Sequence, residues 1–282
     1  MAVYVPNVLW LPPGYEDYTQ NKDSLWHLDE LSGITCLDCK AVPPSTYFNG
    51  VYRDGGYGPP PPGSKHWTLG EPGINASDHK SVKFWSVGIY PSSQLGFMAV
   101  TGPFGSAGWG RDLDLKYNSD YTFEVWYKLD PNAGGDLGHG YHTRALWSYT
   151  WQLVDQHDSF SCQINDTSNP TLSLLGDFLK TNGSFSLPYN TLYNVWHHIV
   201  AVGDEANHLV EVYFDGQLLG TTLKAISSPS YRASVLWLGA RNAGVYGPMY
   251  STGGWLDEFA VYGEKLTSDQ ILAHYASGII GL

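Results

Sequence analysis

The acidic side chains on the predicted strands are the first place where this sequence could carry chemistry. Glycoside hydrolysis with retention needs two carboxyl groups about 5–5.5 Å apart, and residues two apart on a strand point to the same face. Glu124 shares its predicted strand face with Trp126 and Lys128, so no second carboxylate accompanies it. Asp257 and Glu258 are adjacent and therefore point to opposite faces. No predicted strand carries a hydrolytic pair by itself, although carboxylates from two different strands could still meet.

Histidines occur in two arrangements. His197 and His198 lie on opposite faces of one predicted strand, which favours a structural role for both. His139 and His142 lie in the loop 136–142, where a metal or polar ligand could be held, although loops of this composition are usually only solvated. No nucleophile elbow and no phosphate-binding glycine loop is found.

The cysteines do not predict a metal site. Cys36 and Cys39 form one C-x-x-C pair, and Cys162 stands alone. A structural zinc site needs a second pair of ligands at suitable spacing, which the histidines do not clearly supply. We therefore expect free or occasionally paired thiols.

Aromatic residues are abundant, with 11 Trp and 20 Tyr. Exposed rings beside amide and carboxylate groups are typical of sugar-binding surfaces, because a pyranose offers C–H faces and fixed hydroxyls. Trp147, Tyr149 and Trp151 share a strand face with Leu153, which predicts that they belong to the core. Rings in glycine-rich loops are harder to bury, and the predicted ligand-binding surface consists of Trp109, His139, Tyr141, Asn242, Tyr246 and Tyr250.

Composition favours a β-sandwich. The 282 residues include 43% hydrophobic residues, 32 Gly and 17 Pro, enough for a large core interrupted by many turns. The net charge of -12 argues against nucleic acid, which needs a basic face, and is compatible with cation binding. No apolar run is long enough to span a bilayer, so we expect no membrane insertion. The first residues lack a basic segment followed by an apolar one, so we expect no secretory signal.

The chain is predicted to be an arm followed by one domain. Residues 1–20 are rich in Pro and Tyr and form the predicted N-terminal arm. Residues 21–282 form the predicted domain, with a Pro/Gly-rich, loop-like insertion around 40–75.

The segment 255–276 predicts a last strand followed by a short helix. One strand face is predicted to carry Trp255, Asp257, Phe259 and Val261. Thr267 and Gln270 form a capping box at the start of the helix, and Gly278 is placed to end it. The apolar stripe of the helix is predicted to consist of Ile271, Leu272 and Tyr275.

Several short motifs occur in the order and spacing of one family. They are Tyr-Thr-Phe-Glu-Val-Trp at 121–126, Trp-His-His-Ile-Val-Ala at 196–201, the Tyr-x-Asp-Gly hairpin at 213–216 and the segment 255–276. Together they resemble laminin-G-like jelly-roll domains of the concanavalin A-like lectin/glucanase superfamily. The resemblance covers residues 24–277 and implies an all-β fold, a two-sheet antiparallel jelly-roll sandwich with a short C-terminal helix.

The resemblance also implies a structural calcium ion. Related jelly rolls hold Ca²⁺ with an Asp near the start of the last strand and with backbone carbonyls of the N-terminal strand. Asp257 matches that Asp, and Asp29 or Glu30 lies on the segment expected to face it. The alternative is that Asp257 accepts backbone N–H bonds or pairs with a nearby Arg or Lys. Glucanases of the superfamily carry Glu-x-Asp-x-x-Glu on a strand, and this chain has no such motif.

Because this fold is used mostly for binding, we predict a non-catalytic binding or assembly module. The favoured placement is a bacteriophage virion, as a tail, fibre or capsid decoration protein within a larger assembly, in contact with a glycan or a neighbouring virion protein. The missing secretory signal, the arm and the Pro/Gly-rich insertion favour this placement. The alternatives are a cellular lectin-like protein that binds carbohydrate, and a glycoside hydrolase or lyase on the same scaffold.

Overall fold

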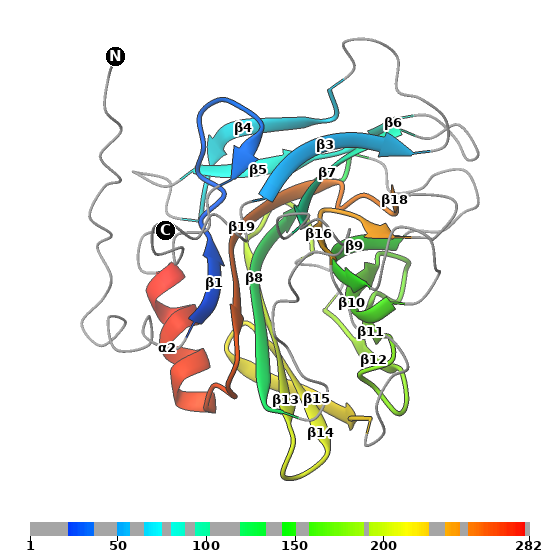
Figure 1. Cartoon of the computed structure of the whole chain (residues 1–282), viewed down its shortest axis with the longest axis vertical. Helices are drawn as coiled ribbons and strands as arrows, with labels where there is room; N and C mark the ends of the chain where they lie inside the picture. The colour runs from blue at the N-terminus through cyan, green and yellow to red at the C-terminus, as the bar shows by residue number, and fades with distance from the viewer. Residues whose placement is uncertain are drawn as a thin grey trace, which may run out of the picture.

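Over the residues that it describes, the computed structural model shows two large antiparallel β-sheets packed face to face and one helix (Figure 1). It describes residues 22–36, 50–56, 65–74, 80–87, 94–101, 119–133, 143–150, 158–188, 192–225, 235–242 and 248–279. The predicted all-β sandwich with a short C-terminal helix is confirmed. Within these ranges no helix is both long and apolar enough to cross a membrane.

Sheet 1 has the strand order β15-β14-β13-β8-β19-β5-β4, with β1 also paired to β19. Its strands are β1 (Lys22–Trp26), β4 (Trp67–Pro72), β5 (Lys80–Phe84), β8 (Tyr121–Leu129), β13 (His197–Asp204), β14 (Leu209–Phe214), β15 (Gln217–Leu223) and β19 (Gly254–Tyr262).

Sheet 2 has the strand order β12-β11-β10-β9-β16-β7-β3-β2, with β6 also paired to β7. Its strands are β2 (Thr35–Cys36), β3 (Gly50–Gly56), β6 (Ser86–Val87), β7 (Gln94–Thr101), β9 (Thr143–Thr150), β10 (Asp158–Asn165), β11 (Thr171–Leu175), β12 (Gly183–Ser186) and β16 (Val235–Leu238). A separate pair consists of β17 (Arg241–Asn242) and β18 (Pro248–Met249).

Aromatic rings fill the space between the sheets. Phe123 of β8 stacks on Trp147 of β9 with ring centroids 5.7 Å apart, and Tyr121 meets Phe160 of β10 edge-on at 5.5 Å. Trp147 and Tyr149 are buried, as predicted. Large rings packed in this way dominate the burial of apolar surface that stabilises a sandwich.

Strand β19 contains a bulge that the sequence did not reveal. Its pairing with β8 shifts between Asp257 and Ala260, and Glu258 has a φ of 45°. The extra residue changes the side-chain alternation, so the main core receives Leu256, Phe259 and Val261. Asp257 instead lies opposite Trp126, which belongs to a separate cluster on the outer face of sheet 1. The prediction that Asp257 shares a face with Phe259 and Val261 was therefore wrong.

Helix α2 (Ser268–Ile279) packs on the outer face of sheet 1. The predicted capping box is confirmed, since Thr267 N donates to Gln270 Oε1 (2.7 Å) and Gln270 N to Thr267 Oγ1 (3.3 Å). Gly278 does not end the helix as predicted. It lies within the last turn, where an added Cβ would be 2.2 Å from the Trp126 ring. Leu272 was wrongly placed in the buried stripe, because it is 50% exposed and His274 is buried instead.

His274 contacts a carboxylate buried beneath the helix. Glu124 of β8 is 3% exposed and accepts hydrogen bonds from His198 Nε2 (2.8 Å) and Tyr262 OH (2.6 Å). His274 Nδ1 lies 3.0 Å from Glu124 Oε1. Burial alone would raise the pKa of Glu124, but His274 and His198 outweigh it and hold that pKa well below its usual value. Glu124 therefore joins β8, β13, β19 and α2 as an ionised carboxylate.

The paired histidines of β13 point to opposite faces, as predicted. His198 binds Glu124, whereas His197 Nδ1 lies 2.9 Å from Asp215 Oδ2 and the His197 ring stacks on Phe214. Both rings are buried and hold strands together.

The segment 40–75 is only partly what the sequence predicted. It contains strands β3 and β4, whose buried side chains Tyr52 and Trp67 stack with centroids 5.1 Å apart. The loop-like prediction was wrong for these strands, because the surrounding Gly and Pro hide a short alternating pattern. The predicted arm, residues 1–20, lies outside the described residues, as does Cys39, whereas Cys36 and Cys162 are buried thiols.

Replacing Glu124 with Gln should lower the free energy of unfolding by about 3 kcal/mol near neutral pH, because it removes a buried, charge-assisted hydrogen-bond acceptor. The depressed pKa also sets a pH dependence. The stabilisation by Glu124 is complete above the ordinary carboxyl pKa of 4.5 and is lost as the pH falls toward the lower, folded-state pKa.

Urea unfolding of the wild-type and Glu124→Gln chains across the acid range measures both effects. The matched control is Glu211→Gln on strand β14 of the same sheet. An acid-induced loss of stability as steep in Glu124→Gln as in the wild type would contradict the assignment.

Candidate functional site

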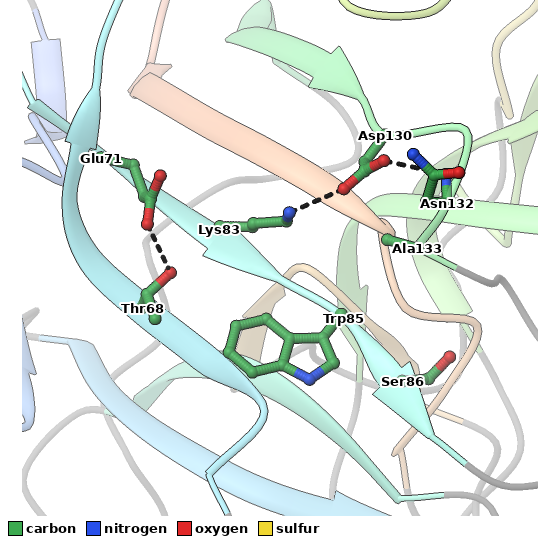
Figure 2. A pocket seen from close by; sticks show the side chains of 8 residues that line it. All are labelled: Thr68, Glu71, Lys83, Trp85, Ser86, Asp130, Asn132 and Ala133. Atoms are coloured by element: carbon green, nitrogen blue, oxygen red, sulfur yellow. Dashed lines mark hydrogen bonds and ion pairs between the residues drawn. The ribbon is translucent and has the colours of Figure 1, made fainter.

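A hollow of about 460 Å³ lies where β4, β5 and the turn after β8 meet (Figure 2). The side chains that line it come from Thr68, Glu71, Lys83, Trp85, Ser86, Asp130, Asn132 and Ala133. Most of these residues are polar or charged, and one is a large aromatic residue, so the hollow can offer both a ring and hydrogen-bonding groups to a ligand.

Trp85 stands at the point where the chain crosses between the sheets. β5 of sheet 1 ends at Phe84 and β6 of sheet 2 begins at Ser86. The backbone N–H of Trp85 donates to the His66 carbonyl (3.0 Å), and the Trp85 carbonyl accepts from Gly96 N (3.1 Å). The indole is half-buried, with its ring edge-on to that of His66. The crossover thus fixes the backbone of Trp85, and the indole lies against the His66 ring while part of it stays exposed.

One wall of the hollow is an ion pair. Lys83 Nζ donates to Asp130 Oδ2 at 2.6 Å, and Asn132 N donates to Asp130 Oδ1 at 2.8 Å (Figure 2). Burial alone would raise the pKa of Asp130, but the Lys83 hydrogen bond and the backbone N–H groups outweigh it and lower that pKa. Asp130 is therefore an ionised acceptor at neutral pH.

The opposite wall carries a second carboxylate. Thr68 Oγ1 donates to Glu71 Oε1 at 3.0 Å (Figure 2). Trp255 of β19 donates its indole N–H to Glu71 Oε2 at 3.4 Å. Trp255 is half-buried and lies beside the hollow, with Lys83 Nζ 4.3 Å from its ring centroid.

A buried arginine positions the turn that carries Asp130 and Asn132. Arg144 of β9 donates from Nε to Asp166 Oδ2 at 2.8 Å, and both residues are buried. Its Nη1 donates to the carbonyls of Ala133 and Gly253. Arg144 therefore ties the end of this turn to the start of β19.

Asp130 of the lining does not meet one requirement of glycoside hydrolysis. Glycoside hydrolysis requires one carboxyl group that stays protonated to act as the acid. Asp130 is unsuited to that role, since Lys83 and the backbone keep its pKa low. Burial raises the pKa of Asp257, but this residue is fully buried and does not line the hollow.

The predicted ligand-binding residues do not form this hollow. Trp109, His139, Tyr141 and Tyr246 lie outside the described residues. The backbone of Asn242 pairs with Pro248, and Tyr250 is half-buried, with a φ of 59° and a carbonyl that accepts from Ala145 N. None of the eight lining residues was predicted from the sequence. Trp85 itself is a single ring at a strand end, and nothing in the adjacent sequence marks it.

Two of the predicted metal residues, Asp257 and Glu30, have other hydrogen-bond partners. Asp257 accepts from Ile74 N (2.9 Å) and from Glu258 N (3.0 Å), which is the alternative left open by the sequence. Glu30 accepts from Tyr52 OH at 2.7 Å. In the described part of the chain no three His, Cys, Asp or Glu side chains, with Asp29 included, gather closely enough to hold a metal ion.

A calcium ion at Asp257 would therefore depend on backbone carbonyls, and calcium stays a prediction. If calcium binds at Asp257, Ca²⁺ should raise the melting temperature of the wild-type chain, and Asp257→Asn should abolish that rise. A wild-type melting temperature that stays the same with and without Ca²⁺ would contradict a calcium site at Asp257.

Replacing Arg144 with Met should lower the free energy of unfolding by about 3–5 kcal/mol, because it leaves Asp166 buried without its ion-pair partner. Arg53→Met is the control, since Arg53 is an exposed arginine on β3. Urea unfolding of the two variants checks this; equal, small losses would show that the turn does not depend on Arg144.

A laminin G family model, described as "Concanavalin A-like lectin/glucanases superfamily", matches residues 106–272, more than half of the chain. No curated protein matches the chain. Among solved structures, the botulinum neurotoxin serotype D binding domain is similar, with a TM-score of 0.55 and 12% identity over 91% of this chain and 52% of that chain. The receptor binding domain of botulinum neurotoxin C/D mosaic serotype gives a TM-score of 0.56 and 11% identity over 92% of this chain and 51% of that one.

A structure of botulinum neurotoxin type C gives a TM-score of 0.55 and 14% identity over 93% of this chain and 52% of that one. The chain thus spans about half the length of these neighbours. At such low identity they support the fold alone, whereas the family model covers most of the motifs found in the sequence. The chain belongs to the concanavalin A-like lectin/glucanases superfamily.

Proposed function

We propose that this chain is a non-catalytic, lectin-type module that binds a glycan in the hollow around Trp85. The observation that carries the proposal is the half-buried indole of Trp85, which lies beside charged and hydroxyl groups. These groups include both hydrogen-bond donors and hydrogen-bond acceptors. A pyranose presents C–H faces that stack on an aromatic ring and hydroxyls that bond to such groups. Because the protein already holds Trp85 and Asp130 in place, little conformational entropy would be lost in ordering them when a sugar binds.

The comparisons support this proposal at the level of family. The superfamily includes lectins, and the similar structures are described as binding domains. One of them is described by the statement that cell entry of botulinum neurotoxin type C is dependent upon interaction with two ganglioside molecules. Those words concern the neurotoxin, so the glycan proposed for this chain depends on the hollow itself.

The virion placement, as a tail, fibre or capsid decoration protein, is also a proposal, and it depends on sequence features alone. A glycan-binding module would suit such a protein as its contact with a host surface. An assembly contact with a neighbouring virion protein is the role that would remain if no glycan binds.

A glycan array followed by titration of the best ligand tests the proposal. Trp85→Ala should weaken binding about tenfold or more, because a lost stacking contact costs about 1.4 kcal/mol. The matched control is Trp109→Ala, which removes a ring from the loops that the sequence favoured. Melting temperatures show whether each variant is folded.

A blank array from folded wild-type protein would contradict glycan binding. Binding that Trp109→Ala weakens and Trp85→Ala leaves unchanged would contradict the hollow as its site. Release of reducing ends from the bound glycan would contradict the non-catalytic part of the proposal.

A further inference from the structure

Lys128 lies next to the hollow on the outer face of sheet 1. It is directly opposite Trp255 in the pairing of β8 with β19, two strands that run side by side in Figure 1. Its Nζ is 4.5 Å from the ring centroid of Trp255 and 4.8 Å from that of Trp196. An ammonium group at these distances interacts with the faces of both indoles.

Lys128 differs from its neighbour Lys83 in its partners. Lys83 is paired with Asp130 at 2.6 Å, whereas no carboxylate of the described residues forms an ion pair with Lys128. Lys128 is half-buried, and burial lowers its pKa; Lys83 adds to that effect, while Glu71 and Asp257 oppose it. Burial has thus removed part of the hydration of this cation, and none of the carboxylates in the described segments is bonded to it.

The indole of Trp255 connects this lysine to the hollow. Lys83, which lines the hollow, and Lys128 both lie over the Trp255 ring, and the Trp255 indole N–H reaches Glu71. If one sugar residue of an oligosaccharide occupies the hollow, the next sugar residue would therefore lie close to Lys128. The half-buried indole of Trp255 would offer that residue an apolar surface, whereas Trp196 is buried.

Nearby acidic groups do not prevent an anion from binding here. Glu71 already accepts hydrogen bonds from Thr68 and Trp255, and these donors offset part of its charge. Asp257 is fully buried, and its carboxylate already accepts hydrogen bonds from Ile74 N and Glu258 N. Lys83 adds a second cation on the same ring.

We propose that Lys128, Trp196 and Trp255 form a subsite for the acidic residue of a saccharide, so that the chain prefers glycans carrying a carboxylate or a sulfate. The ammonium group of Lys128, held over the ring of buried Trp196, would pair with the anion, and the half-buried indole of Trp255 would pack against the sugar ring. This inference rests on the proposed glycan-binding function and adds a class of ligand to it.

The test uses pairs of saccharides that differ only in the anion. Sialyllactose and its methyl ester test a carboxylate, and lactose with one sulfate on its galactose and unmodified lactose test a sulfate. The wild-type chain should bind the acidic member of at least one pair about tenfold more tightly, a difference of about 1.4 kcal/mol. Rising salt should reduce that preference, because it screens partly exposed charges.

Variants of Lys128 assign the preference to this subsite. Lys128→Met should abolish it while leaving binding of the neutral member unchanged, and Lys128→Arg should retain it. The control is Lys180→Met, which removes an exposed lysine between β11 and β12.

Equal binding of acidic and neutral members by the wild type would overturn the inference and leave the proposed function standing. A preference that survives in Lys128→Met would also overturn it. Failure of folded protein to bind any saccharide of the pairs or of the array would overturn the proposed function and this inference together.

Discussion

The position of the last strand is the constraint on which the rest of the structure depends. β19 ends the sheet-forming part of the chain, yet it lies inside sheet 1, with β8 on one side and β5 and β1 on the other (Figure 1). Sheet 1 therefore cannot close until residues far apart in the sequence have met, which is typical of β-sandwiches with many non-local contacts. The same docking brings Trp255 between Lys83 and Lys128, so the proposed binding surface exists only in the completed sheet.

The outer face of sheet 1 is divided between a covered part and a part with polar and aromatic groups. Helix α2 covers one part, and the buried carboxylate of Glu124 joins the helix to the strands through His198, His274 and Tyr262. Beyond the helix lie half-buried Lys128 and Trp255. The bulge in β19 makes this division possible, because it sends Phe259 into the core while Asp257 stays on the outer side.

Sequence patterns predicted the fold better than the site. Strand alternation at 121–129, the hairpin at Asp215-Gly216 and the capping box at Thr267 each depend on neighbours in the sequence, and the structure contains all of them. The hollow depends instead on the meeting of Thr68, Trp85 and Asp130, which belong to separate segments. One of these, β4, lies in a segment whose Gly and Pro made it look like a loop, and the bulge at Glu258 depends on pairing register, which alternation in a single strand does not reveal.

The central claim, that a glycan sits against Trp85 and Trp255, is tested most directly by the indole N–H signals of protein labelled with ¹⁵N-tryptophan. The chain has 11 tryptophans, and substitution with Phe one at a time assigns the signals of Trp85 and Trp255. Titration with the strongest glycan from the array should shift these two signals first and saturably, with Trp196 affected as well by an acidic glycan. Shifts confined to other indoles, such as that of Trp109, with Trp85 and Trp255 unmoved at saturation, would contradict the account.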